Sequence, residues 1–71
     1  MDRERVESSS IRSVGYGPEA AVLEVEFASG GVYRYFEVPA AEYLALMAAV
    51  SKGRHVNASI KPRYSFRRVT L

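Results

Sequence analysis

At 71 residues the chain has room for one domain, which we expect to span residues 1–71, and such a domain buries only roughly 60% of the surface of its unfolded chain. Hydrophobic residues make up 48% of the sequence and charged residues 25%, a composition typical of a globular domain. The chain contains no cysteine, which excludes disulfides, thiolate catalysis and cysteine-based metal sites. No apolar run approaches the roughly 20 residues needed to cross a bilayer, and the N-terminus does not resemble a signal peptide, so we expect a cytoplasmic protein with no membrane partner.

The charges are segregated along the chain. Residues 1–42 hold four basic residues and all eight acids, whereas residues 43–71 hold six basic residues and no acid. Such an asymmetry favours an anionic partner for the C-terminal third. The alternative is that the acidic strands neutralise the basic end within one compact fold.

The N-terminal part is weakly patterned. Residues 1–7 are polar and alternate in charge, so we expect them to be frayed. Residues 11–16 predict a strand in which Ile11 and Val14 fall on opposite parities, and a bulge near Gly15 would reconcile them.

The clearest signal is a hairpin. Residues 22–27 alternate apolar and acidic side chains with the period of a half-buried strand. Gly30 and Gly31 follow, and residues 32–38 are rich in aromatic and β-branched side chains. Because glycine adopts the positive φ of tight turns without steric cost, this order predicts a β-hairpin.

The hairpin register decides the environment of Tyr33 and Tyr35. A two-residue loop would place both rings on an open sheet face, like a stacking platform for nucleic acid, but beside acidic side chains that repel phosphate. A three-residue loop with a glycine bulge would place Tyr33 opposite Phe27 and Tyr35 opposite Val25, with both rings packed under a helix. Aromatic side chains belong to a core more often than to a ligand platform, so we favour the second register.

A helix follows over residues 40–51, with Pro39 suited to its first position. One apolar stripe repeats at helical spacing through Tyr43, Leu46, Met47 and Val50. Gly53 is the expected stop. Residues 54–60 predict a further helical turn, and residues 64–71 a last strand.

These elements predict an α+β fold: a small antiparallel sheet with one main helix packed on one face, a short second helical turn and a C-terminal edge strand. Besides the helix stripe, the expected core comprises Leu23, Val25, Phe27, Phe36 and Ile60.

Several short motifs occur in a familiar order: Ser10-Ile11, Tyr33-Arg34-Tyr35, Val38-Pro39, Ser51-Lys52-Gly53, and Asn57 before Ile60. Together they resemble the KTSC domain, named for the C-terminal extension of some lysyl-tRNA synthetases and also found as small stand-alone bacterial proteins. The resemblance covers roughly residues 6–69. It implies a stand-alone member of that family, and the family's association with a tRNA enzyme suggests RNA binding.

The basic C-terminal third is the main candidate site. Its charged and aromatic side chains suit phosphate contacts and base stacking: Lys52, Arg54, Lys61, Arg63, Tyr64, Phe66, Arg67 and Arg68. Six charges engaged on single-stranded RNA would give a salt slope of about −4. The alternatives are an edge strand kept soluble by its charges, and an adaptor that binds another protein or a second copy of itself.

Catalysis is disfavoured. His55 could act as a general base and Ser51 or Ser59 as a nucleophile, but no carboxylate lies in this half of the sequence to orient the imidazole. No phosphate-binding glycine motif is present, and one histidine without cysteine disfavours a metal site. We therefore expect a non-catalytic binding module with no metal or cofactor, whose partner is RNA or another polyanion.

Overall fold

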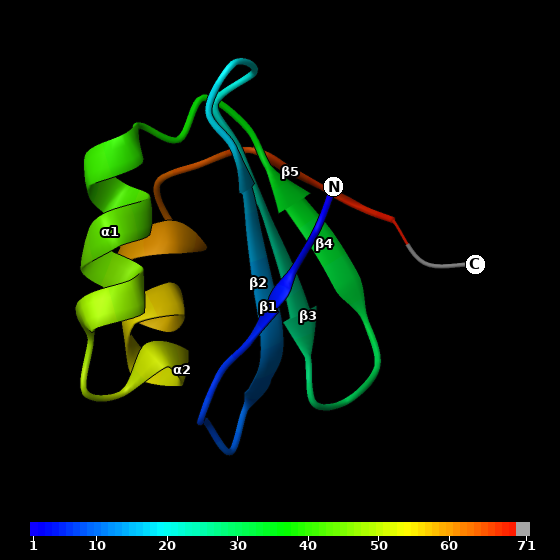
Figure 1. The fold of residues 1–71 in the computed structure, drawn as a ribbon, viewed down its shortest axis with the longest axis vertical. Coiled ribbons are helices and arrows are strands. Elements are labelled where there is room, and N and C mark those ends of the chain that lie inside the picture. The colour runs from blue at the N-terminus through cyan, green and yellow to red at the C-terminus, as the bar shows by residue number, and fades with distance from the viewer. Residues whose placement is uncertain (70–71) are drawn as a thin grey trace.

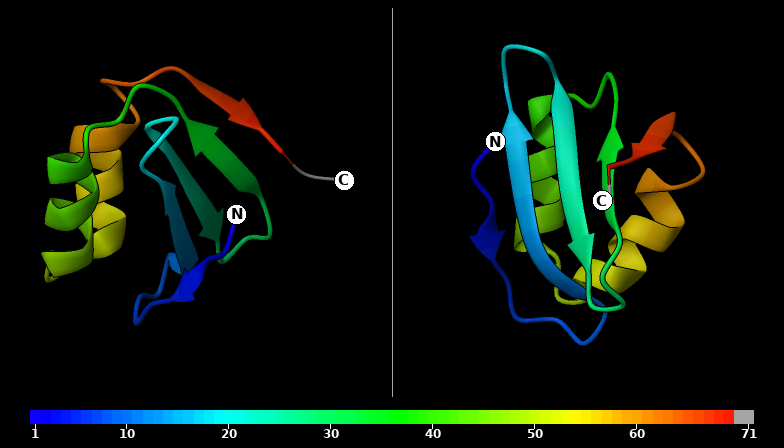
Figure 2. Two further views of the ribbon diagram at one scale, coloured as in Figure 1. Left: turned by 45° about the horizontal axis from the view of Figure 1, so that its top comes forward. Right: turned by 90° about the vertical axis from the view of Figure 1, so that its right-hand side faces the viewer.

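The fold, taken from a computed structural model that describes residues 1–69, is a five-stranded antiparallel sheet with helices on one face (Figure 1). The elements are β1 (Glu4–Arg5), β2 (Ile11–Gly17), β3 (Val22–Phe27), β4 (Val32–Tyr35), α1 (Ala40–Ala48), α2 (Lys52–His55), the π-helical turn η1 (Val56–Ile60) and β5 (Phe66–Arg68). The strands lie side by side in chain order, and the helical segment stands between β4 and β5 in sequence. Figure 2 (right) shows the sheet in front and the helices behind it. The predicted α+β class is confirmed. Within residues 1–69, no helix has the length and hydrophobicity of a membrane span.

The N-terminal residues are not frayed, contrary to the prediction. Glu4 and Arg5 pair with β2, and the Arg3 guanidinium bonds to the Glu24 carboxylate. Gly15 makes room for this segment, since a Cβ there would lie 2.6 Å from the carbonyl oxygen of Asp2. The bulge of β2 was expected near Gly15, but the shift in pairing lies between Ile11 and Ser13.

The β3–β4 hairpin has a three-residue loop, residues 28–30. The Phe27 amide donates to the Gly31 carbonyl at 2.9 Å, and Gly30 takes a positive φ of 108°. Tyr33 and Tyr35 lie on the helix-facing side of the sheet, as in the favoured register. Their partners, however, are Val25 and Leu23, each two residues nearer the start of β3 than the expected Phe27 and Val25.

The core lies between the sheet and the helices. Its buried members are Ile11, Val14, Leu23, Val25, Tyr35, Val38, Leu46, Val56 and Ile60, and Phe27 packs partly buried against them. Phe36 was expected in the core and is not part of this cluster. Since side chains alternate along an extended chain, Phe36 follows the buried Tyr35 on the other side.

Helix α1 ends at Ala48, three residues earlier than predicted. Ala49 takes an extended conformation, which turns the chain away and leaves Val50 fully exposed instead of buried. Leu46 is fully buried, and Tyr43 stacks on Tyr16 of β2 with ring centroids 4.8 Å apart. The predicted burial of the apolar stripe is thus confirmed for Tyr43, Leu46 and Met47 and is wrong for Val50.

Gly53 does not stop a helix but lies inside α2. The Ser51 hydroxyl caps α2 by accepting the Arg54 amide at 3.3 Å. A Cβ on Gly53 would lie 2.9 Å from the Ser10 hydroxyl, so a close approach between segments requires this glycine. The predicted turn over residues 54–60 is formed by the end of α2 and by η1. The expected last strand is shorter than predicted, and residues 70–71 lie outside the described residues.

Candidate functional site

The residues that were predicted to bind nucleic acid do not lie on one face of the domain. They divide into Lys52 and Arg54 on α2, Lys61 at the end of η1, Arg63 and Tyr64 before β5, and Phe66, Arg67 and Arg68 on β5. Lys52 is partly engaged, because its ammonium donates to the Ala49 carbonyl at 3.2 Å.

Arg63 and Tyr64 contact the carboxylate of Glu42, which is more than 20 residues earlier in the sequence. Glu42 of α1 accepts hydrogen bonds from the Tyr64 hydroxyl at 3.1 Å and from the Arg63 guanidinium at 3.4 Å, and its other oxygen lies 2.8 Å from His55 Nε2. Burial and the hydrogen bond to Glu42 raise the pKa of Tyr64. The cluster joins α1 and α2 to the segment before β5.

This contact supplies the carboxylate that a catalytic His55 would need, but it does not supply a nucleophile. The Ser51 hydroxyl is engaged as the cap of α2. Within residues 1–69 neither the Ser51 hydroxyl nor the Ser59 hydroxyl is hydrogen-bonded to the imidazole ring of His55. Among the described residues, no group of three or more histidine, aspartate or glutamate side chains lies close enough together to hold a metal ion. The Glu42–His55 pair therefore serves to hold the helices together.

A groove forms where the helices stop covering the sheet. In Figure 2 (left), β5 runs away from the helices. The hollow has a volume of about 370 Å³, within the range of about 300–1,000 Å³ usual for ligand sites. We call it the aromatic groove; it is lined by Phe27, Ser29, Tyr33, Tyr35, Lys61 and Phe66.

The rings of the aromatic groove contact one another. Tyr33 lies between Phe27, at 5.6 Å in an edge-to-face arrangement, and Phe66, at 5.7 Å. Phe66 also meets Tyr35 at 5.8 Å and remains 57% exposed. These distances fit ordinary aromatic pairs, so the walls support each other while Phe66 offers an open ring.

Cations flank these rings. The Lys61 ammonium lies 5.1 Å from the centre of the Phe27 ring, and the Arg68 guanidinium lies 5.7 Å from that of Tyr33. Arg68 is opposite Tyr33 in the β4–β5 pairing, and Phe66 is opposite Tyr35. Pairing of β5 with β4 therefore brings together rings and positive charges that are distant in sequence.

Tyr35 forms the least exposed part of the aromatic groove. Its exposed fraction is only 2%, and burial, with a smaller effect of Tyr33, raises the pKa of its hydroxyl. Within residues 1–69 this hydroxyl has no hydrogen-bond partner, whereas the Tyr16 hydroxyl donates to the Val38 carbonyl at 2.6 Å.

The other face of the sheet carries the acids of β3, which arginines neutralise. Glu24 is 3% exposed and bonds to Arg3 and, at 2.7 Å, to Arg34 Nε. Burial alone would raise the pKa of Glu24, but the hydrogen bonds and charges of both arginines outweigh burial and lower it. Arg67 lies on this face, opposite Arg34, and is exposed.

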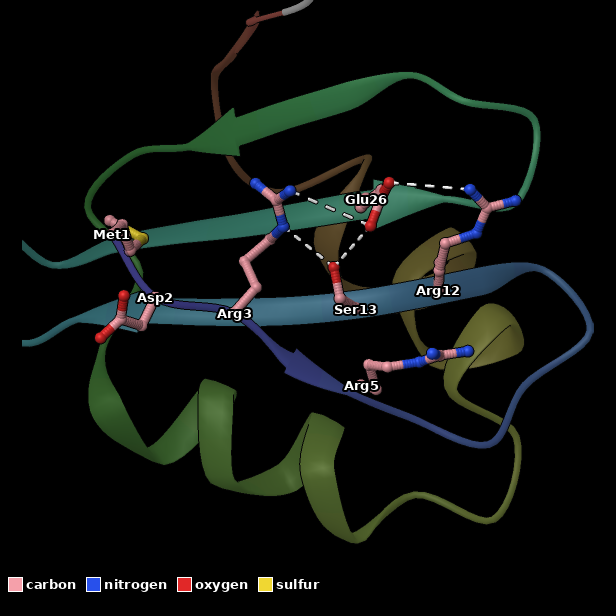
Figure 3. Close-up of a pocket in the computed structure, with 7 residues that line it drawn as sticks. All are labelled: Met1, Asp2, Arg3, Arg5, Arg12, Ser13 and Glu26. Carbon is pink, nitrogen blue, oxygen red and sulfur yellow. Dashed lines mark hydrogen bonds and ion pairs between the residues drawn. The ribbon is translucent and has the colours of Figure 1, made fainter.

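A polar hollow of about 700 Å³ opens on the same face beneath the N-terminal segment (Figure 3). Ser13 accepts from Arg3 Nε at 2.9 Å and donates to Glu26 at 2.8 Å, and the Arg12 guanidinium lies 3.9 Å from Glu26. Asp2 and Arg5 also line the hollow, so its lining holds three arginines and two carboxylates. Arg3 and Arg12 are engaged with Ser13 and Glu26, and these contacts join the N-terminal segment to the sheet.

The fold and the site together define a small α+β domain with an aromatic groove between β3, β4 and β5. The chain belongs to the KTSC domain family, whose sequence profile matches residues 7–64. An uncharacterized protein of Stutzerimonas stutzeri is 52% identical over 64 residues, which cover 90% of each chain.

Larger proteins contain the same domain. A lysine–tRNA ligase of Nostoc punctiforme is 39% identical over 64 residues, which cover 90% of this chain and 11% of the ligase. Among solved structures, a KTSC domain protein from Yersinia pestis superposes with a TM-score of 0.94 at 39% identity, with 97% of both chains covered. The family predicted from the short motifs is therefore confirmed.

Proposed function

We propose that this chain is a non-catalytic module that binds single-stranded RNA through the aromatic groove. The observation that carries the proposal is that the open ring of Phe66, the ring of Tyr33 and the cation Lys61 line one hollow. A second cation, Arg68, lies over the Tyr33 ring. Proteins that bind single strands combine rings, on which bases stack, with positive charges that follow the phosphates. The occurrence of similar domains in lysine–tRNA ligases is consistent with an RNA ligand. Such a ligand would place the protein in the cytoplasm.

The charge layout supports a smaller footprint than the sequence suggests. Lys61 lines the aromatic groove, and Arg68 lies over the ring of Tyr33. Arg67 lies on the other face of the sheet. Lys52 and Arg54 lie on α2, and Arg63 faces Glu42. Two engaged charges correspond to a salt slope of about −1.4, instead of the −4 expected for all six.

Fluorescence polarisation with a labelled single-stranded RNA decamer at several salt concentrations tests this proposal. Phe66→Ala should weaken binding about tenfold, because one stacking platform is lost. The matched control is Leu44→Ala: Leu44 is 63% exposed, close to the 57% of Phe66, but lies on α1 away from the aromatic groove. No binding by the unaltered chain at low salt, or equal binding by both variants, would contradict the proposal.

A second candidate function is self-association through α1. Its outward positions, Ala41, Leu44, Ala45 and Ala48, recur at helical spacing and are all exposed and apolar, as is Val50 after the helix. An apolar surface of this kind is suited to a second copy of the chain. Sedimentation velocity at rising concentration should then show a dimer that Leu44→Lys dissociates; a monomer throughout would exclude this function.

A further inference from the structure

The hydroxyl of Tyr35 has an unusual position. The side chain is almost entirely buried, yet its hydroxyl has no hydrogen-bond partner within residues 1–69. Buried tyrosine hydroxyls usually find a partner, and an exception calls for an explanation. In the described part of the chain, no fully enclosed side-chain nitrogen or oxygen atom lacks a partner. The Tyr35 hydroxyl must therefore keep some access to solvent, and the aromatic groove is a hollow that this residue lines.

The surroundings of this hydroxyl suit a flat ring. Phe66 lies against Tyr35 at 5.8 Å and against Tyr33 at 5.7 Å, so two further rings stand beside it. A nucleobase is flat, and its edges carry hydrogen-bond donors and acceptors in a pattern that differs between bases. A tyrosine hydroxyl can donate to a ring nitrogen or carbonyl, or accept from an exocyclic amine. Lys61 at the other side supplies a positive charge for the attached phosphate.

We propose that the aromatic groove holds one unpaired base of a single-stranded RNA, and that the Tyr35 hydroxyl bonds to the edge of this base and so gives the module a base preference at one position. This inference rests on the proposed RNA binding and adds selectivity to it. Stacking on Phe66 and Tyr33 accepts every base, because each has a flat face. Selectivity requires a polar group that meets the edge, and Tyr35 is the deeply buried polar side chain of the groove.

The test uses the full chain and labelled decamers of abasic ribose in which one central position carries uracil, adenine, cytosine, guanine or no base. The unaltered chain should bind one central base about fivefold better than the least preferred base, as expected for one net hydrogen bond. Tyr35→Phe keeps the ring and removes the hydroxyl, so the preference should fall below twofold while the affinity for the abasic decamer stays unchanged. The matched control is Tyr43→Phe, whose ring stacks on Tyr16 outside the aromatic groove, and the preference should persist in it.

Each outcome decides the inference. Loss of the preference in Tyr35→Phe alone supports it. RNA binding with equal affinity for all central bases, or a preference that survives in Tyr35→Phe, overturns base reading and leaves the proposed function standing. No binding to any decamer overturns both, and titration with nucleoside 5′-monophosphates then shows whether the aromatic groove takes free nucleotides instead. Crosslinking of a decamer with central 4-thiouridine provides a second measurement on the unaltered chain: adducts at Tyr35 or Phe66 support the inference, and adducts confined to α2 overturn it.

Discussion

The substitution Leu46→Ala tests the packing of α1 on the sheet through its effect on the free energy of unfolding. The Leu46 side chain is fully buried between the sheet and the helices, whereas Leu44, two residues earlier on the same helix, is 63% exposed. The same chemical change, leucine to alanine, can therefore be made once inside and once outside the core. Burial of the three missing carbons is worth about 2.4 kcal/mol at about 0.8 kcal/mol per methylene group. The cavity left in a packed interior brings the cost for Leu46→Ala to about 3–4 kcal/mol.

A loss of this size is large for so small a domain. Domains are stable by roughly 0.05–0.15 kcal/mol per residue, so the whole domain has about 4–10 kcal/mol available. Leu46→Ala should lower the midpoint of thermal unfolding by about 12–32 °C. Leu44→Ala should change the free energy of unfolding by less than about 0.5 kcal/mol, as surface substitutions usually do. Urea unfolding measures both, and equal effects of the two substitutions would refute the placement of α1 on the sheet.

Three further predictions concern charge and packing. Because arginines lower the pKa of Glu24, its carboxylate stabilises the fold above its unfolded pKa of about 4.3, and this contribution is lost as the pH falls through the lower folded pKa. Glu24→Gln should therefore be less stable at pH 7, and urea unfolding at several pH values should show the difference shrinking below about pH 4. The raised pKa of Tyr64 has the opposite sense: its contribution is present below the usual tyrosine value of about 10 and is lost as the pH rises through the folded pKa, so Tyr64→Phe should flatten the alkaline limb of the stability curve. Gly53→Ala should destabilise the fold although alanine favours helices by about 1 kcal/mol, because its Cβ would meet Ser10; Ser10→Gly should restore the loss, and an additive double variant would contradict the close approach.

The parts of the fold predicted from sequence are those that depend on local pattern. The alternation of Leu23 and Val25 with acids defines β3 whatever surrounds it, and the spacing of Tyr43, Leu46 and Met47 defines the buried side of α1. Val50 shows the limit of this reasoning, since it continues the spacing after the backbone has already left the helix.

The errors arise where distant segments meet. Residues 1–5 have no strand pattern of their own and are ordered by the arginine–carboxylate contact on β3 and by the space above Gly15. Glu42 and His55 lie 13 residues apart, and only the turn between α1 and α2 brings them together. The basic residues were predicted to form one site because they are close together in the sequence. In the structure, side chains alternate along β5, so Arg67 lies on one face of the sheet and Arg68 on the other.

The three-residue strand β5 has a thermodynamic consequence. One wall of the aromatic groove comes from β3 and β4 and the other from β5 and the segment before it, so the groove exists only while β5 is paired. That pairing is bounded by two backbone hydrogen bonds, from the Phe36 amide to the Ser65 carbonyl at 2.9 Å and from the Val69 amide to the Val32 carbonyl at 2.7 Å. Short exposed edge segments open locally at a lower free energy than the core does. Any ligand of the aromatic groove must therefore also tighten this edge, and slower hydrogen exchange of these two amides would report its binding without a label on the ligand.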